Sequence, residues 1–506
     1  WSWDLFGSFS QNEASFTAEN QIVFDRVALA IGDNDRCVAN GCVPLNIFGS
    51  ITPEMADYIR QTGRDEHRTE QINTGFSVTG RLLELPAGPL GVAAGVEYRR
   101  ESALDRPDEM VNQPAEFVTT NRSTGAPRDG TSGNYNVREA YIEFDVPLLA
   151  DVAGARNLDL SAAARLSDYS TFGSETTFKL GLAWRPIDDI LLRTTWSEGF
   201  RAPSILELFQ GGRETNFQAI DPCSGGGGGL TGCAGVPGTY DQLQFNNGLI
   251  RGQTGGNLNL EAETSETVSV GVVLTPRAIE GLSLSVDWFK IDIDDAIATR
   301  NAQQILNACA NRGGTNCDLV QRDPNTGEVL RLLQSVSNFT STKVEGVDAT
   351  LRYRFSTGIG EFNAVLDAAR LISFKNIVPQ PDGTVTVEER AGLGFPARTT
   401  MPKWRGTGSL RWTNGPFEAG WRGRYIGSSR DIADNFVNGG KHRSTLYHDL
   451  QFVYNLDQWD ASVTLGIDNV TDRSPPPSRA NAPINFDIFM YDARGTHWYL
   501  RLFKAF

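Results

Sequence analysis

The 506-residue chain contains no long hydrophobic run. No stretch approaches the roughly 18 consecutive apolar residues of a membrane-spanning helix. The N-terminal Trp1-Ser2-Trp3-Asp4 has neither a basic nor an apolar signal region, so we expect any targeting segment to have been removed. These absences exclude a helical membrane protein. They leave open a membrane β-barrel, whose strands carry only an alternating signal of about ten residues each.

Basic residues are also scarce, with 46 Lys+Arg against 61 Asp+Glu and a net charge of −15. Proteins that bind nucleic acid neutralise phosphates with basic side chains, so this balance argues against a nucleic-acid partner. Hydrophobic residues make up 40% of the chain and aromatic residues 10%, which excludes a disordered protein. We therefore expect a folded chain with no nucleic-acid function.

Residues that carry catalysis or bind metals are few and scattered. The four histidines (67, 442, 448 and 497) show no catalytic or zinc-site spacing, and there is no Gly-x-Ser-x-Gly motif. The glycine run 225–229 lacks the Lys-Ser/Thr of a phosphate loop. The cluster Asp292, Asp294 and Asp295 and the calcium-loop fragment Asp323-x-Asn325-x-Gly327 are weak cation candidates. We predict no enzyme, catalytic residue, cofactor or metal site, although spacing alone does not exclude an embedded barrel enzyme.

What the sequence does contain is alternation with period two, which is typical of β-strands with one apolar face. In 178–185, Phe178, Leu180, Leu182 and Trp184 alternate with polar or small residues. The same pattern recurs in 157–167, 347–355, 417–425 and 449–456. One change of phase occurs near Trp288, which predicts either a β-bulge or the point at which the strand leaves a bilayer.

The connections between the predicted strands alternate between long and short. We expect about 16 strands, in the layout of outer-membrane barrels, where short turns face the periplasm and long loops face outward. The predicted strands are 1–14, 66–85, 89–104, 135–149, 157–170, 174–186, 190–200, 262–275, 281–296, 341–356, 360–376, 403–414, 416–429, 444–456, 460–471 and 495–506. The predicted extracellular loops lie near 15–65, 105–134, 201–261, 297–340, 377–402 and 472–494. The sequence thus predicts an all-β, transmembrane antiparallel barrel. A soluble sandwich or propeller is the alternative, but neither fold explains why long and short connections alternate.

Six cysteines form three close pairs, all within predicted long loops. They are Cys37 and Cys42, Cys223 and Cys233, and Cys309 and Cys317. Six cysteines allow 15 connectivities, of which we favour neighbour pairing in an oxidising envelope compartment. Metal binding is the rival interpretation, but only Cys37 and Cys42 have a gap comparable to a zinc knuckle.

Several motifs resemble the C-terminal barrel of TonB-dependent outer-membrane receptors, and the resemblance spans nearly the whole chain. Its most specific pieces are Phe178-Lys179-Leu180-Gly181-Leu182-Ala183-Trp184-Arg185-Pro186 and Trp196-Ser197-Glu198-Gly199-Phe200-Arg201-Ala202-Pro203-Ser204, followed by Glu207-Leu208-Phe209. Similar pieces are 257–260 with 263–267, 344–348, 466–472 and the Cys42-Val43-Pro44-Leu45-Asn46-Ile47-Phe48-Gly49 segment. These motifs describe barrel architecture, with Glu263 and Glu266 expected on the lumen side, and do not identify a ligand.

The resemblance implies the latter part of a 22-stranded barrel whose lumen is filled by a plug. Neither the plug nor the TonB box is recognisable in this sequence, so we expect both, with six strands, to be missing from this chain. It further implies import of a scarce ligand, namely a ferric siderophore, cobalamin or an oligosaccharide. The implied partners are TonB with its inner-membrane motor proteins, outer-membrane lipid and the barrel-assembly machinery, for which the terminal strand ending at Phe506 resembles the recognition signal.

Two further functions remain as alternatives. A complete 16-stranded barrel would be a passive porin-like channel, and a chain that neither imports nor conducts would be an adhesin or structural surface protein. No substrate-binding residue is assigned by the sequence. The aromatic and polar loop residues that are candidates to face a ligand, or else to pack the loops together, are Phe209, Phe217, Tyr240, Phe245, Asn246, Asn247, Phe486, Phe489 and Tyr491.

Overall fold

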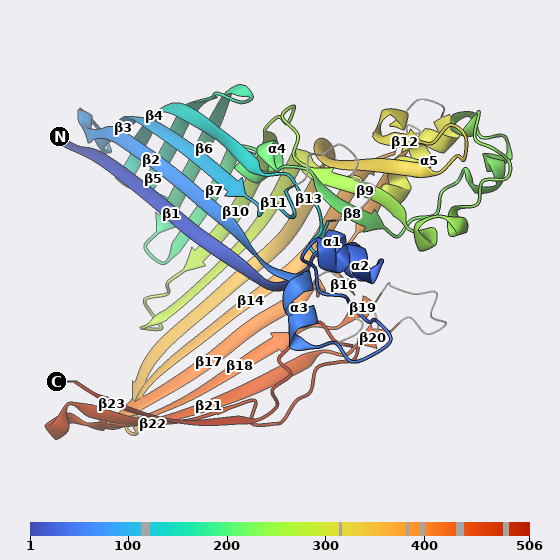
Figure 1. Ribbon diagram of the computed structural model, residues 1–506. Helices are drawn as coiled ribbons and strands as arrows, with labels where there is room; N and C mark the ends of the chain where they lie inside the picture. Colours follow the sequence, from blue (N-terminus) through green and yellow to red (C-terminus); the bar gives the residue numbers. More distant parts are fainter. Residues whose placement is uncertain are drawn as a thin grey trace.

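The computed structural model describes residues 1–112, 122–312, 316–380, 384–394, 400–431, 440–478 and 485–505. Among these residues, twenty strands form one large sheet and three strands form a small second sheet. The large sheet is curved into an open trough, with both chain termini at the same end (Figure 1). Within the described ranges, no helix is long and apolar enough to cross a membrane.

A continuous antiparallel path of paired strands builds the trough from one edge to the other. In spatial order the strands are β1 (Ser2–Ile22), β2 (Arg60–Leu85), β3 (Gly88–Arg106), β4 (Thr131–Val152), β5 (Ala155–Tyr169), β6 (Gly173–Ile187), β7 (Ile190–Arg201), β10 (Glu263–Leu274), β11 (Leu282–Thr299), β13 (Val329–Thr357), β14 (Gly360–Pro379), β17 (Trp404–Asn414), β18 (Phe417–Ile426), β21 (Thr445–Leu456), β22 (Ala461–Asp468) and β23 (His497–Lys504).

The remaining elements lie in the long connections. The short strands are β8 (Arg213–Phe217), β9 (Ile250–Gly255), β12 (Val320–Arg322), β15 (Val385–Glu389), β16 (Leu393–Gly394), β19 (Ser429–Asp431) and β20 (Lys441–His442). The α-helices are α1 (Phe24–Ala30), α2 (Asn34–Ala39), α3 (Pro53–Ile59), α4 (Ile205–Phe209) and α5 (Ala302–Arg312). Short 3₁₀ turns are η1 (Ser224–Gly229), η2 (Thr231–Cys233), η3 (Gln242–Gln244), η4 (Asn246–Gly248), η5 (Cys317–Leu319) and η6 (Asp457–Trp459).

Several strand ends differ from the sequence prediction, and four short strands of the large sheet lie outside the predicted set. The described part of the large sheet has twenty strands, because β8, β9, β12 and β15 also join it from the loops. Several long strands extend further into the loop end than alternation indicated. β1 continues to Ile22, β2 starts at Arg60 and β13 starts at Val329. These extensions pair mainly with loop segments, so their side chains need no apolar-polar alternation.

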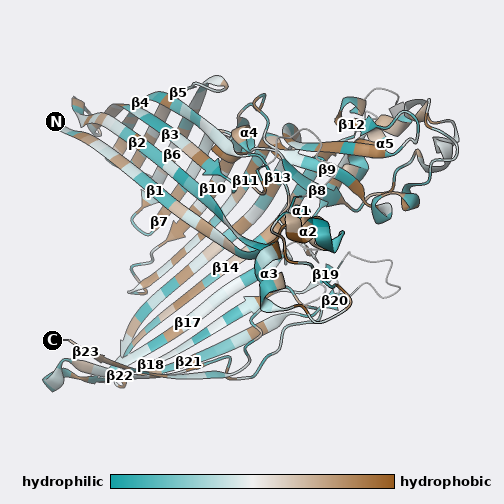
Figure 2. Ribbon diagram, in the orientation of Figure 1, coloured by the Kyte–Doolittle hydropathy of each residue, from teal (hydrophilic) through white to brown (hydrophobic). Residues whose placement is uncertain are grey.

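The two faces of the sheet differ in polarity. On the outer face, apolar side chains meet side by side on successive strands, as in Leu180 beside Trp196, Val270 beside Trp288, and Leu410 beside Trp421. Many of them are exposed, including Val270 at 51% and Leu500 at 67%. Brown bands cross the strands of the trough (Figure 2). An exposed apolar band of this extent indicates a lipid-facing surface.

Tryptophans border this band at both ends of the strands. At the loop end, the indole N–H groups of Trp196 and Trp288 donate to Glu266 (2.8 Å) and Glu345 (3.0 Å). At the turn end, Trp184 and Trp412 donate to the carbonyl oxygens of Gly154 (3.0 Å) and Ile359 (2.7 Å). Indole rings favour the boundary between hydrocarbon and water, because one side of the ring is apolar and the N–H needs an acceptor. These two belts mark the two boundaries of the apolar band.

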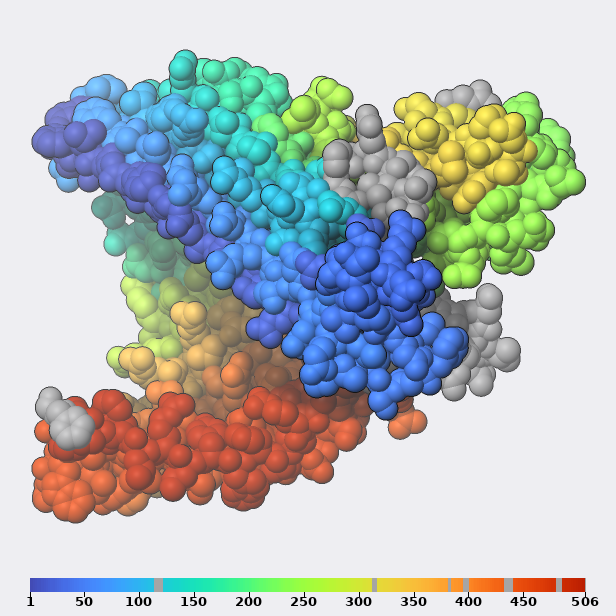
Figure 3. All heavy atoms as spheres, in the orientation of Figure 1, coloured from blue at the N-terminus to red at the C-terminus, as the bar shows by residue number. Residues whose placement is uncertain are grey.

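The inner face lines a hollow that is visible between β1–β3 and β21–β23 (Figure 3). Its side chains are mainly polar and charged. The edge strands β1 and β23 do not pair with each other in the described residues. The fold is therefore an all-β antiparallel sheet with the two-sided polarity of a membrane barrel. Closure of the barrel and the number of its strands stay predictions.

The phase change near Trp288 has a specific origin. Trp288 pairs regularly with Val270 and Val347, so no bulge lies at this residue. The register shifts occur later, between Ile293 and Ile297. Charged outer-face residues begin directly after Trp288, which agrees with the strand leaving the bilayer at that point. In the last strand, Trp498, Leu500 and Leu502 share one face, whereas Phe506 lies outside the described residues.

Candidate functional site

The long connections gather at one end of the trough and the short turns at the other (Figure 1). The connections that follow β7 and β11 fold together into one unit, which we call the loop lobe (described residues 210–255, 300–312 and 316–336). In this lobe β8 pairs with β9, and β9 runs parallel to the start of β13, from Gly252 beside Leu332 to Gly255 beside Ser335. The lobe has its own apolar core of Ile250, Ala302, Ile305, Leu306, Cys309, Val320, Val329 and Leu332.

Disulfides join the cysteines as neighbours in sequence. They link Cys37 with Cys42, Cys223 with Cys233, and Cys309 with Cys317, and the described part of the chain has no free cysteine. Two of the three lie in the loop lobe, where the Cys309 bond ties the end of α5 to the turn before β12. Each bond closes a short loop and limits its unfolded conformations, which stabilises the folded loop.

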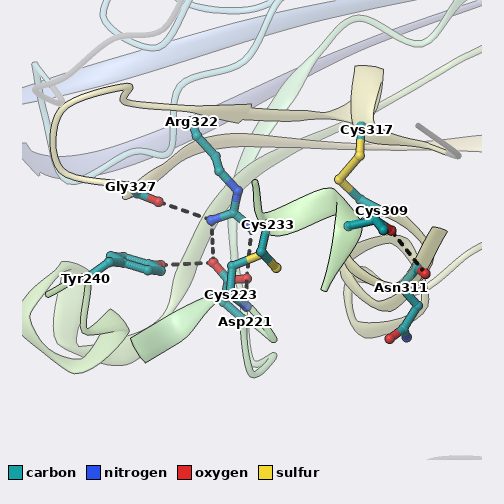
Figure 4. The surroundings of a disulfide bond; sticks show 10 residues. Asp221, Cys223, Cys233, Tyr240, Cys309, Asn311, Cys317, Arg322 and Gly327 are labelled. Atoms are coloured by element: carbon teal, nitrogen blue, oxygen red, sulfur yellow. Dashed lines mark hydrogen bonds and ion pairs between the residues drawn. A yellow bond between two sulfur atoms is a disulfide. The ribbon is translucent and has the colours of Figure 1, made fainter. Parts of the chain in front are cut away.

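A buried ion pair connects the two halves of the loop lobe (Figure 4). Arg322 donates from Nη2 to Asp221 Oδ1 (2.8 Å) and from Nη1 to Oδ2 (2.5 Å), and the Tyr240 hydroxyl donates to the same Oδ2 (3.0 Å). The Asp221 side chain is fully buried. Burial and the Asp221 carboxylate raise the pKa of Tyr240 above its ordinary value, so this hydroxyl stays a donor. The pair therefore clamps segments that are 101 residues apart in sequence.

A second group of buried polar side chains joins three late loops; we call it the polar knot (Thr400, Ser429, Asp431, His442, Ser478, Asp487 and Tyr491). Ser478 donates to Asp431 Oδ2 (3.0 Å), and Asp487 Oδ2 accepts the Thr400 backbone N–H (2.6 Å). The His442 ring contacts Ser429 Oγ through Nδ1 (3.2 Å) and places Nε2 3.8 Å from Asp431 Oδ2. Burial lowers the pKa of His442 and raises the pKa of Tyr491 to about 12.

The segment after β7 turns onto the inner face. Ser204 caps α4 through a reciprocal capping box with Glu207, and Phe209 packs against Gly133 of β4. Arg201 donates to both Glu207 and Glu263. Glu263 accordingly faces inward, as expected, but the expectation for Glu266 is wrong. Glu266 lies on the outer face with Trp196, because odd and even positions of a strand point to opposite faces.

Most loop residues that were candidates to face a ligand pack the loops instead. Tyr240 and Tyr491 are buried, and Phe217 packs on the core of the loop lobe. Phe486 packs on a core of Ile426, Tyr447 and Tyr491. Asn246 donates to Asn216 (2.7 Å), and Phe245 lies 5.9 Å from the Tyr240 ring. Phe489, at 73%, and Asn247 stay exposed.

Cavities lie along the inner face below the loops. One, of about 780 Å³, is bordered by β1–β4 and α4, with His67, Glu101, Asp105, Tyr135 and Ile205 among its lining residues. Two more, of about 510 and 300 Å³, share Asp348, Ala369, Arg405 and Met490 and so adjoin each other. These cavities show where a small molecule fits between loops and strands.

The weak cation candidates have structural roles in the described chain. Asp292 Oδ2 forms an ion pair with Lys290 Nζ at 2.9 Å. Asp323 Oδ1 accepts the backbone N–H groups of Asn325 and Thr326 in a turn. Gly225 to Gly229 all have positive φ, a conformation that glycine adopts without strain. No cluster of three or more His, Cys, Asp or Glu that could hold a metal occurs among the described residues.

The chain is similar to a known protein family. A family model described as "TonB dependent receptor-like, beta-barrel" matches residues 1–470. No curated protein sequence matches the chain.

Solved structures share the fold at low sequence identity. A mutant of the ferric enterobactin receptor PfeA from Pseudomonas aeruginosa, solved with enterobactin, has a TM-score of 0.60 at 13% identity, covering 98% of this chain and 59% of that one. The siderophore receptor PirA from Acinetobacter baumannii has a TM-score of 0.58 at 15% identity, covering 99% of this chain and 60% of that one. The FrpB iron transporter from Neisseria meningitidis has a TM-score of 0.51 at 14% identity, covering 87% of this chain and 56% of that one. The chain thus spans about three fifths of the length of these structures.

Proposed function

Because the chain belongs to the family of TonB-dependent receptor-like β-barrels, which lie in the bacterial outer membrane, we propose that it is the main barrel portion of an importer of a small, scarce ligand. In this proposal the ligand is captured at the loop end and released at the turn end. TonB and its inner-membrane motor proteins supply the energy. The family is one of receptors and transporters and not of enzymes.

The observation that carries the proposal is the organisation of the loop end. Two long connections form a lobe with its own core, two disulfides and a buried ion pair, and three late loops meet in the polar knot. Such ordering lowers the conformational entropy that loops lose when they close on a ligand. Cavities lie directly below these loops on the inner face. This arrangement supports a receptor that captures ligand outside and passes it inward.

We propose a ferric siderophore as the ligand, ahead of cobalamin or an oligosaccharide. The support is that the structures named above are receptors for ferric enterobactin and siderophores and an iron transporter. Contact with TonB requires a plug and a TonB box, which we propose for the remaining part of the full-length protein. Outer-membrane lipid around the apolar band and the barrel-assembly machinery complete the proposed partners.

The test is uptake of radioactive iron by cells that produce the full-length protein in place of their own siderophore receptors. We expect saturable uptake from at least one ferric siderophore, and loss of that uptake when TonB is deleted. Matched cells carrying an empty vector supply the background. Uptake that persists without TonB would overturn energised import.

A passive porin-like channel is the second candidate. A 16-stranded pore needs pairing between β1 and β23 to close, and the described residues contain no such pairing. The same uptake experiment separates the two functions. A passive channel predicts influx that rises linearly with solute concentration and is independent of TonB.

A further inference from the structure

Six arginines lie on the inner face within four neighbouring strands, two each on β13, β17 and β18, whereas β14, between β13 and β17, contributes none. Asp348, Ala369 and Arg405 form the first row across β13, β14 and β17. Each row is a set of residues that lie side by side on the inner face of successive strands. The second row has Arg424 on β18, the third has Arg352 on β13 and Arg422 on β18, and the fourth has Arg354 on β13 and Arg411 on β17. Rows on one face are two residues apart, or about 6.6 Å along a strand. We call Arg352, Arg354, Arg405, Arg411, Arg422 and Arg424 the arginine ladder.

Most arginines of the ladder lack a counter-charge in the described part of the chain, unlike several other arginines of the inner face. Elsewhere, Arg165 pairs with Glu97 and Glu139, and Arg193 pairs with Asp287. Within the ladder, Arg424 lies 3.6 Å from Asp449. For the other five arginines, no side-chain hydrogen bond or ion pair is present in the described part of the chain, and all five are exposed.

Among the described residues, the carboxylates near the ladder do not pair with most of its arginines. Three aspartates, Asp348, Asp367 and Asp449, lie in its first three rows, and Glu361 and Glu418 lie in the row that follows the fourth, so five carboxylates border six arginines. Asp367 accepts a hydrogen bond from Thr350 (2.8 Å), and Asp449 accepts the backbone N–H of Asn469 (2.9 Å). The carboxylates of Asp367 and Asp449 therefore each accept a hydrogen bond from an uncharged donor.

The loop end of the ladder opens into the two adjoining cavities. Arg405 lines both of them, and Arg424 lines the larger one. Met490 lines the same cavities and comes from the β22–β23 connection, which also contributes Asp487 and Tyr491 to the polar knot. A small molecule bound in these cavities would therefore contact the loop end of the ladder. The remaining arginines of the ladder lie between the cavities and the turn end.

We infer that the arginine ladder is an anion-binding track on the inner wall, which takes a small ligand bearing carboxylate, phosphate or other negative charge. The use of the track in import rests on the proposed function, whereas the binding of anions does not. Guanidinium groups offer forked donors that suit oxyanions. Exposed sites of this kind bind weakly and are screened by salt, and a series of weak sites lets a ligand move from one to the next.

The first experiment measures chemical access to the ladder in the full-length protein in detergent. Phenylglyoxal modifies accessible arginines, and peptide mass spectrometry reports the rate at each position. We expect inorganic pyrophosphate to slow modification of Arg352, Arg354, Arg405, Arg411 and Arg422 several-fold relative to chloride at equal ionic strength. The exposed Arg36 on α2, outside the trough, is the matched control and should be unaffected.

Two outcomes would overturn the anion track. Equal modification rates with pyrophosphate and chloride would show that anions do not bind. Absence of modification without any added anion would show that the ladder is covered by an acidic surface of the remaining polypeptide, which would then be its true partner.

The second experiment tests the use of the track. The triple variant Arg352→Gln, Arg354→Gln, Arg411→Gln removes charge far from the loops and is compared with Arg36→Gln. We expect several-fold slower uptake of iron from an anionic ferric tricatecholate, with unchanged uptake from an uncharged ferric trihydroxamate. Equal loss for both complexes would indicate damage to the barrel and contradict the proposed role. If the unmodified protein imports neither complex, iron import fails, and the protection measurement alone decides on anion binding.

Discussion

Arg201 at the end of β7 holds the Glu263 carboxylate at the start of β10 through two parallel hydrogen bonds, Nε to Oε2 (2.7 Å) and Nη2 to Oε1 (2.8 Å). The same guanidinium holds Glu207 on α4 (2.9 and 3.0 Å), and Glu263 also accepts the backbone N–H of Ile297 on β11 (2.6 Å). One arginine thus connects two barrel strands with the segment that turns onto the inner face. Arg201 and Glu207 both belong to the segment 196–209 that resembles TonB-dependent receptors in sequence.

Replacement of Glu263 by Gln should loosen this junction. Glu263 is largely buried but Arg201 is half exposed, so we expect a loss of about 1–2 kcal/mol rather than the larger cost of a fully buried pair. The measurement is urea unfolding in detergent, with Glu266→Gln on the outer face of the same strand as the control. Equal effects of the two substitutions would contradict the assigned role of Arg201.

Arg322→Met should unfold the loop lobe locally while the barrel remains intact. The substitution leaves the buried Asp221 carboxylate without its cation, which costs about 3–5 kcal/mol. Hydrogen exchange should show lost protection in α5 and around Tyr240. Arg277→Met, which removes an exposed pair with Asp188 and Asp189 at the turn end, should change little. Retained protection in Arg322→Met would show that the ion pair does not hold the lobe.

The polar knot should loosen as the pH falls below about 6.5, the ordinary pKa of histidine. Burial lowers the pKa of His442 in the folded knot, although the Asp431 and Asp487 carboxylates act in the opposite direction. The opened knot therefore binds the proton more readily, and the stability contributed by neutral His442 is present at high pH and lost in acid.

Hydrogen exchange at β19 and β20, corrected for the intrinsic effect of pH, measures this change. Between pH 7.5 and 5.5 we expect reduced protection in the unmodified protein. His442→Gln, which cannot gain a proton, should show a flat response. A decrease of the same size in both proteins would assign the pH effect to another group.

Val270→Arg should impair insertion into lipid far more than Ser269→Arg. Val270 lies on the outer face halfway between Glu266 and the end of β10, whereas the neighbouring Ser269 points to the inner face. An arginine at the bilayer midplane of a barrel costs about 2–4 kcal/mol. Folding yield and urea stability in phosphatidylcholine vesicles report the difference. Similar stabilities would contradict the assignment of the two faces.

Much of the fold could be predicted from local sequence, because the faces of a strand follow from backbone geometry alone. Alternation in 178–185 and 347–355 correctly separated outer from inner residues, and the motifs around Arg201 led to the family that the family model confirms. The misplacement of Glu266 came from grouping it with Glu263 by motif, since alternation puts these two residues on opposite faces. Alternation missed the extensions of β1, β2 and β13, whose loop-side pairing does not require an apolar face.

The candidate site was predictable only in outline. The long loops and the close cysteine pairs were visible in the sequence, but the Asp221–Arg322 clamp, the polar knot and the arginine ladder were not. Their members are distant in sequence and meet only after strands pair in a particular register. The sequence by itself determined which side of each strand faces lipid, because that depends on neighbouring residues. Tertiary structure decided which charges are paired and which are left open, because that depends on contacts between distant segments.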